Sequence, residues 1–166
     1  MKPSSPQAVG AIALCLFASS ALGVGVGDSA PAFALPGAAG DTTSLEMLRG
    51  QVVYVDFWAS WCGPCKRSFP WMNELQQKYA GKGLAIVAIN VDKKREDARK
   101  FLATTPAQFN IVYDPAGITP ASYEVKGMPS SYLVDAQGRV VVVEQGFRDE
   151  RKDAIEDRIR ALLAAR

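Results

Sequence analysis

Histidine is missing from this sequence altogether, and its 166 residues include only three cysteines. Without histidine, the chain cannot build a His-ligated haem, copper or zinc site. A zinc site made only of thiolates needs four cysteines, which the chain does not have. The sequence therefore predicts no zinc site, and we expect no metal or other cofactor.

The chain also lacks an excess of charge. Its formal net charge is +2, and it has neither a block of basic residues nor a basic stripe interleaved with aromatics. The usual electrostatic signature of a nucleic-acid-binding protein is therefore absent, and the sequence argues against that class. With 48% hydrophobic residues, the length suffices for one well-buried core, and we expect a single globular domain.

Residues 1–23 have the pattern of an export signal. They carry one positive charge at Lys2, an apolar run over about 8–17, and then small residues. This is typical of a cleaved signal peptide. A longer apolar stretch over 8–26 offers the alternative of a membrane anchor, because a spanning helix needs roughly 20 residues. In both cases we expect the domain over 24–166 to be periplasmic or otherwise exported.

The first cysteine, Cys15, lies inside this apolar run and is preceded by Leu14. A lipoprotein signal would have a small residue before the cysteine, so we do not expect lipidation. If the signal is removed, Cys62 and Cys65 are the two cysteines that remain. A peroxidase is disfavoured, since no separate peroxide-reactive cysteine is left.

Strand and helix patterns alternate along the rest of the chain. Continuous β-branched runs are typical of strands buried on both faces, and apolar residues at three- and four-residue intervals are typical of helices. We expect strands over 51–59, 84–92, 110–114, 127–135 and 138–146, and helices over 64–81, 93–105 and 149–164. Shorter elements are expected near 33–35, at 44–50 with Ser44 as the helix N-cap, and near 118–125. The fold class is α/β, with helices on both faces of one mixed sheet.

The cysteine pair stands in WASWCGPCKRSFP, residues 58–70, where a strand passes into a helix. A structural disulfide across so short a loop removes little entropy from the unfolded chain. At a helix N-terminus, unpaired N–H groups and the helix dipole favour a thiolate. This spacing therefore predicts dithiol-disulfide chemistry. Two-coordinate copper(I) binding needs only two thiolates and stays an alternative.

The residues between the cysteines suggest how the two thiols differ. Pro64 suits the first turn of a helix, and Gly63 permits close backbone approach. We expect Cys62 to be the exposed, attacking thiolate and Cys65 to be the more buried thiol that resolves the mixed disulfide.

These residues carry a family resemblance. VDFWASWCGPCKRSFP resembles the active-site segment of the thioredoxin superfamily, and FALPGAAGDTTSLEMLRGQVVYVDFWASWCGPC resembles the exported TlpA/ResA-like thiol-disulfide oxidoreductases. The likeness runs from about Pro31 to the end of the chain. It implies a thioredoxin fold with an N-terminal hairpin and a central insertion at about 95–123. It also implies protein disulfides as substrates and a membrane electron donor of the DsbD/CcdA type.

The resemblance also implies roles for residues around the pair. Pro129, in the sequence GMP, is expected to be a cis proline beside the disulfide. The backbone of Met128 is then expected to pair with an extended substrate segment. Trp61 is expected on the recognition surface, and Trp58 in the core.

Asp56 lies six residues before Cys62, inside a strand otherwise built for burial. A buried carboxyl group is expected to be protonated near neutral pH or hydrogen-bonded. Thioredoxins have an acid here that exchanges protons with the buried cysteine, so the resemblance implies this role for Asp56. The alternative is a polar residue that faces the edge of the sheet.

One position departs from the family pattern. Many ResA-like reductases and their cytochrome-maturation relatives have glutamate three residues after the second cysteine, and Ser68 stands here. This weakens the case for apocytochrome c as the substrate. We expect Asp56 to take over the proton transfer that this glutamate would otherwise serve.

The Gly-Pro dipeptide indicates the direction of electron flow. Thioredoxins share it, and their potential is roughly −270 mV, against about −120 mV for the oxidant DsbA. The sequence therefore predicts an exported disulfide reductase. A thiol oxidase or isomerase stays open, as does a copper(I)-handling protein in copper-enzyme or cytochrome c assembly.

Overall fold

A computed structural model describes residues 24–166. The strands are β1 (Ala34–Pro36), β2 (Thr42–Ser44), β3 (Val52–Trp58), β4 (Leu84–Asn90), β5 (Asn110–Tyr113), β6 (Ser130–Val134) and β7 (Val140–Gln145). The helices are α1 (Cys65–Tyr79), α2 (Arg95–Thr104), α3 (Ile118–Ser122) and α4 (Lys152–Ala164), with one-turn helices η1 (Glu46–Leu48), η2 (Ala80–Lys82) and η3 (Asp149–Arg151).

The predicted signal and Cys15 lie outside the described residues. Within 24–166, no helix has the length and apolar character needed to cross a membrane.

The main sheet has five strands in the order β5-β4-β3-β6-β7, and β1 and β2 form a separate antiparallel hairpin. At its centre β3 runs parallel to β4 and antiparallel to β6. Every residue of β3 and β4 is buried, as their continuous apolar runs predict. The chain therefore leaves the middle of the sheet just before the cysteine pair.

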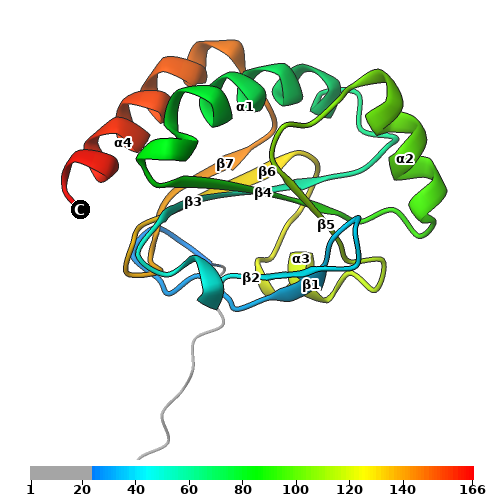
Figure 1. Cartoon of the computed structure of the whole chain (residues 1–166), viewed down its shortest axis with the longest axis horizontal. Helices are drawn as coiled ribbons and strands as arrows, with labels where there is room; N and C mark the ends of the chain where they lie inside the picture. The colour runs from blue at the N-terminus through cyan, green and yellow to red at the C-terminus, as the bar shows by residue number, and fades with distance from the viewer. Residues whose placement is uncertain (1–23) are drawn as a thin grey trace, which may run out of the picture.

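One face of the sheet is covered by α1, α2 and α4 (Figure 1). Side chains at alternate positions of a strand share a face, and Tyr54 and Trp58 of β3 point to this one. Trp58 packs against Phe69 of α1 and Phe101 of α2, with ring centroids 5.0 and 4.9 Å away. This aromatic cluster fixes α1, and with it the cysteine pair, against the strand.

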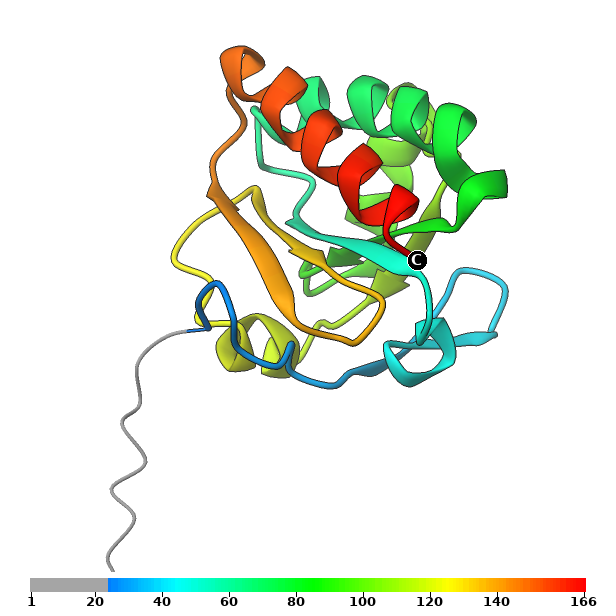
Figure 2. The ribbon, with the colours of Figure 1, turned by 90° about the vertical axis from the view of Figure 1, so that its left-hand side faces the viewer.

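Helix α4 lies beside α1 on the same face (Figure 2). Its apolar side buries Ile155 and Ile159, as the spacing predicts. The hydroxyl of Tyr79 in α1 donates a hydrogen bond of 2.7 Å to Glu156 in α4. The C-terminal helix thus supports the helix that carries the redox pair.

The opposite face has less helix and more extended chain. The β1-β2 hairpin, η1 and α3 cover it (Figure 1), over a cluster that includes Phe33, Phe57 and Tyr123. The hydroxyl of Tyr123 donates to the carbonyl oxygen of Pro31 at 2.9 Å, which ties the N-terminal segment to this cluster.

The prediction of helical turns over 44–50 needs a correction. Ser44 ends β2 and is not the N-cap residue of η1, which is Leu45. The Ser44 hydroxyl still accepts a hydrogen bond from the Met47 N–H at 3.2 Å, so the side chain stabilises the turn from one position further back.

The stretch over 95–123 contains α2, β5 and α3. Strand β5 pairs with β4 and forms an edge of the sheet. Helix α2 buries only Ala98 and Phe101, and its charged residues lie on the outer side, as the sequence predicts. That this stretch is an insertion stays a prediction.

Candidate active site

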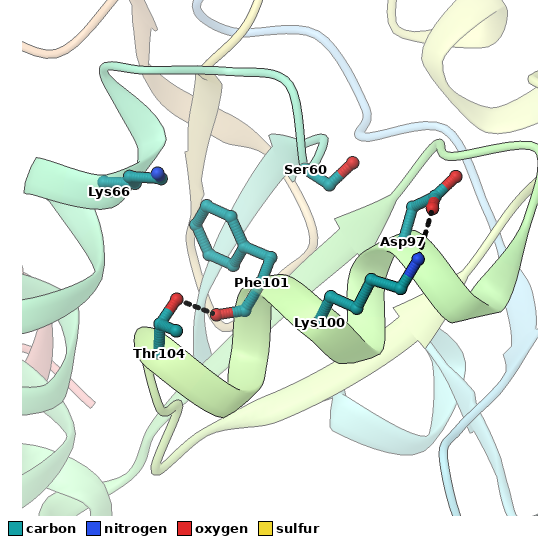
Figure 3. A pocket seen from close by; sticks show the side chains of 6 residues that line it. All are labelled: Ser60, Lys66, Asp97, Lys100, Phe101 and Thr104. Carbon is teal, nitrogen blue, oxygen red and sulfur yellow. Dashed lines mark hydrogen bonds and ion pairs between the residues drawn. The ribbon is translucent and has the colours of Figure 1, made fainter.

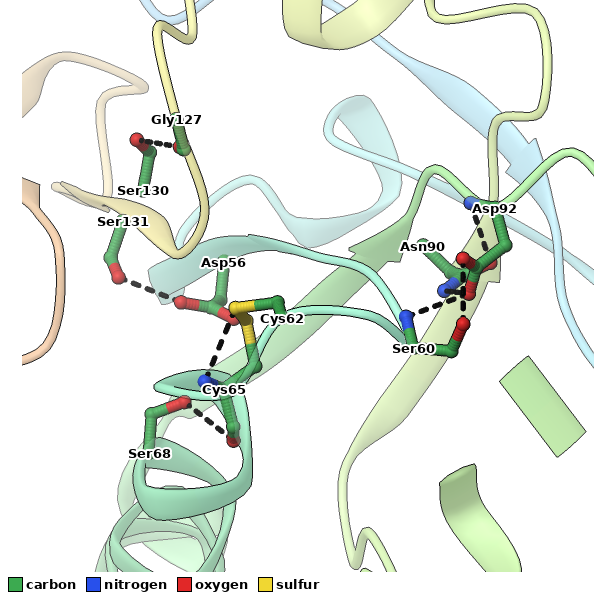
Figure 4. Close-up of a disulfide and its surroundings, with 10 residues drawn as sticks. All are labelled: Asp56, Ser60, Cys62, Cys65, Ser68, Asn90, Asp92, Gly127, Ser130 and Ser131. Atoms are coloured by element: carbon green, nitrogen blue, oxygen red, sulfur yellow. Dashed lines mark hydrogen bonds between the residues drawn. A yellow bond between two sulfur atoms is a disulfide. The ribbon is translucent and has the colours of Figure 1, made fainter. Parts of the chain in front are cut away.

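Cys62 and Cys65 form a disulfide in which the two sulfur atoms are 2.04 Å apart (Figure 4). The pair stands where the chain leaves β3 and enters α1. Pro64 is the N-cap residue, and α1 begins at Cys65. The missing N–H of proline costs nothing at this end of a helix, so Pro64 is tolerated at the N-cap position.

The predicted exposure of Cys62 is wrong for this oxidised state, in which both cysteines are buried. Cys65 is 0% exposed and Cys62 only 3% exposed. The Cys62 sulfur is bonded to its partner, accepts a hydrogen bond from the Cys65 N–H at 3.2 Å, and belongs to the hydrophobic cluster below it. The surface beside the disulfide is formed by Trp61, which is 72% exposed, and by the exposed Gly63 and Pro64.

The peptide bond between Met128 and Pro129 is cis, as the resemblance implies. Pro129 is buried, and its carbonyl oxygen accepts a hydrogen bond from the Gly146 N–H at 2.8 Å. Met128 is half-buried and packs against the cluster that contains both cysteines. The fold therefore packs Met128, from the distant GMP sequence, against the same cluster as the redox pair.

Asp56 is buried in the central strand, 1% exposed, so the edge-facing alternative is wrong. It lies on the same face of β3 as Trp58, and its carboxyl group points toward the disulfide (Figure 4). The hydroxyl of Ser131 donates to its Oδ1 at 2.7 Å, whereas Oδ2 has no hydrogen-bond partner in the described part of the chain. Burial raises the pKa of Asp56 to about 7, and the Ser131 hydrogen bond opposes that rise.

Ser68, where many relatives have glutamate, is buried inside α1. Its hydroxyl donates to the carbonyl oxygen of Cys65 at 3.1 Å. At this position, α1 therefore has a neutral side chain whose hydroxyl is hydrogen-bonded within the helix, where many relatives have an ionisable carboxyl group.

Trp71 of α1 belongs to the core. It is 4% exposed and packs edge-on against Tyr54, with ring centroids 5.9 Å apart. Lys66 and Arg67 are exposed at the start of α1, and neither has a hydrogen bond to the cysteines among the described contacts.

Sequence reasoning missed Asp92, which holds the loop before the cysteine pair (Figure 4). Its carboxylate accepts hydrogen bonds from the N–H and the hydroxyl of Ser60, both at 2.9 Å, and from the Asn90 side chain at 2.8 Å. An acid two residues after a buried strand is a signal that the sequence contains. Its partner Ser60, however, is 32 positions away in the sequence.

A surface pocket of about 300 Å³ lies between this loop, the start of α1, and α2 (Figure 3). Phe101 forms its apolar part, and Lys66 and Lys100 bring positive charge to it. Asp97 faces Lys100 at 3.9 Å. The lining is completed by Ser60 and Thr104.

The residues described, 24–166, contain no group of three or more histidine, cysteine, aspartate or glutamate side chains that could hold a metal ion.

Comparison with known proteins places the chain in a family. The Redoxin family model matches residues 25–159. The chain is 32% identical to the thiol-disulfide oxidoreductase ResA of Bacillus cereus over 131 residues, which is 79% of this chain and 75% of that protein. It belongs to the thioredoxin superfamily as a TlpA/ResA-like member.

Further relatives of this TlpA/ResA-like protein agree. It is 35% identical to the thioredoxin-like protein YneN of Bacillus subtilis over 139 residues, or 82% of this chain and 81% of YneN. Among solved structures, a candidate thiol:disulfide interchange protein DsbE from Chlorobium tepidum matches with a TM-score of 0.81 and 54% identity. The match covers 84% of this chain and 99% of that one. The protein is a thiol-disulfide oxidoreductase with a thioredoxin fold.

Proposed function

We propose that this TlpA/ResA-like protein is an exported reductase of protein disulfides. The observation that carries the proposal is the arrangement of three groups. Cys62 stands next to an exposed Trp61, Cys65 is buried behind it, and the Asp56 carboxyl group, with a pKa of about 7, points toward the pair.

In the first step the Cys62 thiolate attacks one sulfur of a substrate disulfide. A bond forms between the Cys62 sulfur and that sulfur, the substrate disulfide breaks, and its other sulfur leaves as a thiolate. The Cys65 N–H, which donates to the Cys62 sulfur, and the N-terminus of α1 stabilise negative charge on Cys62.

In the second step Cys65 resolves the mixed disulfide. The Asp56 carboxylate takes the proton of the Cys65 thiol, and the thiolate attacks the Cys62 sulfur. The Cys62–Cys65 disulfide forms and the second substrate thiolate leaves, so two electrons have passed from the protein to the substrate. A pKa near 7 suits a group that must accept and return a proton close to neutral pH.

Residues around the pair bind the substrate. An extended segment pairs with the backbone of Met128 beside Pro129, and its side chains contact Trp61, Gly63 and Pro64. The supporting observations are that Met128 packs against the cluster that contains both cysteines, and that Trp61, Gly63 and Pro64, which adjoin the cysteines in the sequence, are exposed.

The oxidised pair must then be reduced again. We assign this step to a membrane dithiol donor of the DsbD/CcdA type, which gives two electrons and becomes a disulfide. The export-signal pattern of residues 1–23 supports this assignment, because it would bring the domain to the side of the membrane where protein disulfides form.

A trapping experiment in the native cell tests the proposal. A Cys65→Ser variant cannot resolve mixed disulfides, so substrates should accumulate on Cys62 and be identified by mass spectrometry. Cys62→Ser is the matched control and should trap none through this pathway. Recovery of exported proteins with cysteine pairs supports the function, and recovery of cytosolic proteins alone contradicts export.

The direction of electron flow needs a second measurement. Equilibration of the purified protein with glutathione should give a potential closer to that of thioredoxin, roughly −270 mV, than to that of DsbA, about −120 mV. A potential near the oxidant value would overturn the reductase in favour of a thiol oxidase. Tight copper(I) binding that requires both cysteines, together with no trapped substrate, would favour a copper-handling protein.

A further inference from the structure

Ser131 is the partner that the structure gives to the Asp56 carboxyl group. The two residues are direct neighbours across the β3-β6 pair, so their side chains lie on the same face of the sheet. Ser131 is 5% exposed, and its hydroxyl donates to Oδ1 of Asp56 at 2.7 Å. This contact joins residues 75 positions apart and has no part in the cysteine chemistry described above.

The hydrogen bond makes the two carboxyl oxygens different. A serine hydroxyl has one hydrogen to donate, and Ser131 uses it on Oδ1. The other oxygen, Oδ2, is buried and has no partner among the described residues. A proton on the carboxyl group is therefore better placed on Oδ2 than on Oδ1.

Among the described residues, Ser131 is the one that donates a hydrogen bond to the Asp56 carboxyl group. The other groups packed around Asp56 are as follows. Its neighbour on β4 is Ala88, which has no polar side chain. Tyr54, on the same strand, has its pKa raised by burial and by the charge of Asp56, and lowered by a side-chain hydrogen bond with Ser131; the net shift is upward, so Tyr54 does not ionise near neutral pH. Cys62, in the loop before α1, and Cys65, the first residue of α1, lie on this face, and α4 contributes Ile155 and Ile159 to it.

Strand β7 adds Glu144, the neighbour of Ser131 on its other side. Its carboxylate is 6% exposed and forms ion pairs with Arg148 and Arg151. These ion pairs compensate the charge of Glu144. Burial and the Ser131 hydrogen bond are the two influences on the pKa of Asp56.

We propose that Ser131 is a positioning residue for proton transfer, which holds Oδ1 of Asp56 so that Oδ2 exchanges the proton with the Cys65 sulfur. This inference rests on the proposed function, in which Asp56 is the base for Cys65. It adds Ser131, a residue of β6, to the groups that serve proton transfer, and it states which carboxyl oxygen of Asp56 carries the proton.

The test isolates the resolution step. Reduced protein is mixed with saturating oxidised glutathione, quenched with acid, and the glutathione adduct on Cys62 is followed by mass spectrometry from pH 5 to 9. Decay of the adduct reports attack by Cys65. In the parent protein the decay rate should rise with pH, with a midpoint near the pKa of Asp56, about 7.

Ser131→Ala removes a hydrogen bond that stabilises the carboxylate. The midpoint should move up by about one pH unit, and resolution at pH 7 should slow about fivefold. Ser131→Thr keeps a hydroxyl and should keep the midpoint. Ser68→Ala removes an equally buried serine hydroxyl that donates to the Cys65 carbonyl oxygen and not to Asp56, so its midpoint should not move.

The effect must pass through Asp56. In an Asp56→Asn background, Ser131→Ala should change neither the rate nor its pH dependence further. Equal slowing in both backgrounds, or an unmoved midpoint in Ser131→Ala, would overturn the inference while leaving the function intact. If Asp56→Asn itself resolves the adduct as the parent does, the proposed role of Asp56 fails instead.

Discussion

Asp56 is an ionisable residue that is almost completely buried. Its carboxylate loses the stabilisation that water would give it, and the one hydrogen bond from Ser131 does not make up for that loss. Its ordinary pKa of 3.8 is raised to about 7. A group whose pKa is higher in the folded state binds its proton more tightly there. The folded protein is therefore more stable where Asp56 is protonated.

We predict that the oxidised protein loses stability as the pH rises from about 4 to about 7. Over that range the unfolded chain gives up the Asp56 proton while the folded protein keeps it. Each pKa unit corresponds to about 1.4 kcal/mol, so the free energy of unfolding should fall by about 4 kcal/mol from this group. Urea unfolding of the parent and of Asp56→Asn at pH 5 and pH 8 measures it.

Asp56→Asn should be the more stable protein at pH 8 and should lack this component of the pH dependence. Asp114 provides a control of opposite sign. Burial acts to raise its pKa, but hydrogen bonds from the Thr119, Gly117 and Ile118 region outweigh burial and lower it. Asp114→Ala should lose stability at neutral pH, and its deficit should shrink only as the pH falls below 3.8, the ordinary pKa of this group, toward the lowered pKa of the folded state. Equal behaviour of the two variants would contradict both assignments.

At the scale of elements, the loop between β3 and α1 is held by a strand that is not its neighbour in sequence. Asp92, just after β4, accepts two hydrogen bonds from Ser60, and Asn90 donates a third. Since α1 starts at Cys65, a fixed Ser60 restricts the positions that Cys62 can occupy. The parallel pairing of β3 and β4 brings these groups to the same edge of the sheet.

We predict that Asp92→Ala destabilises the protein by about 1–3 kcal/mol, because it leaves buried donors without an acceptor. Hydrogen exchange should accelerate most at the Ser60 amide, whose N–H loses its acceptor. Chemical denaturation and amide exchange measure the two effects.

Asp97→Ala is the control for a lost charge in the same region, because Asp97 faces only Lys100, at 3.9 Å, on an exposed helix. Its effect should stay below about 0.5 kcal/mol. If Asp92→Ala were equally mild and Ser60 exchange unchanged, the loop would owe its position to other contacts.

At the scale of the whole molecule, the two faces of the sheet are covered differently. Three helices cover the face of the redox pair, whereas the β1-β2 hairpin, η1 and the short α3 cover the other. Phe33, 7% exposed, and Leu45, 4% exposed, belong to the cluster under this second cover. The Leu45 N–H also donates to the Phe33 carbonyl oxygen at 3.1 Å.

We predict that Phe33→Ala lowers the free energy of unfolding by about 3–5 kcal/mol, as expected for a large aromatic removed from a core. Met47→Ala, in the same cover but 70% exposed, should change it by less than about 0.5 kcal/mol. Denaturant unfolding of both variants checks this. A small effect of Phe33→Ala would show that the hairpin is dispensable for the stability of the domain.

Much of the fold could be predicted because its signals are local. The continuous apolar runs of β3 and β4 and the helical spacing of Phe69, Met72 and Leu75 each lie within one short window. The small errors fall at such places as Ser44, where a side chain stabilises a turn from outside the expected helix. The exposure of Cys62 was misjudged because burial depends on the packing around it and not on its position in the motif.

The sequence by itself determined the C-x-x-C pair at the start of a helix, the acid in the preceding strand, and the α/β pattern, since spacing and periodicity along the chain encode all three. Only the tertiary structure decided that Ser131 donates to Asp56, that Asp92 holds Ser60, and that Met128 packs against the cluster that contains the cysteines. These contacts join residues far apart in the sequence. They follow from the register of β3 with β4 and β6, and a one-residue shift of a strand would turn every such side chain to the other face.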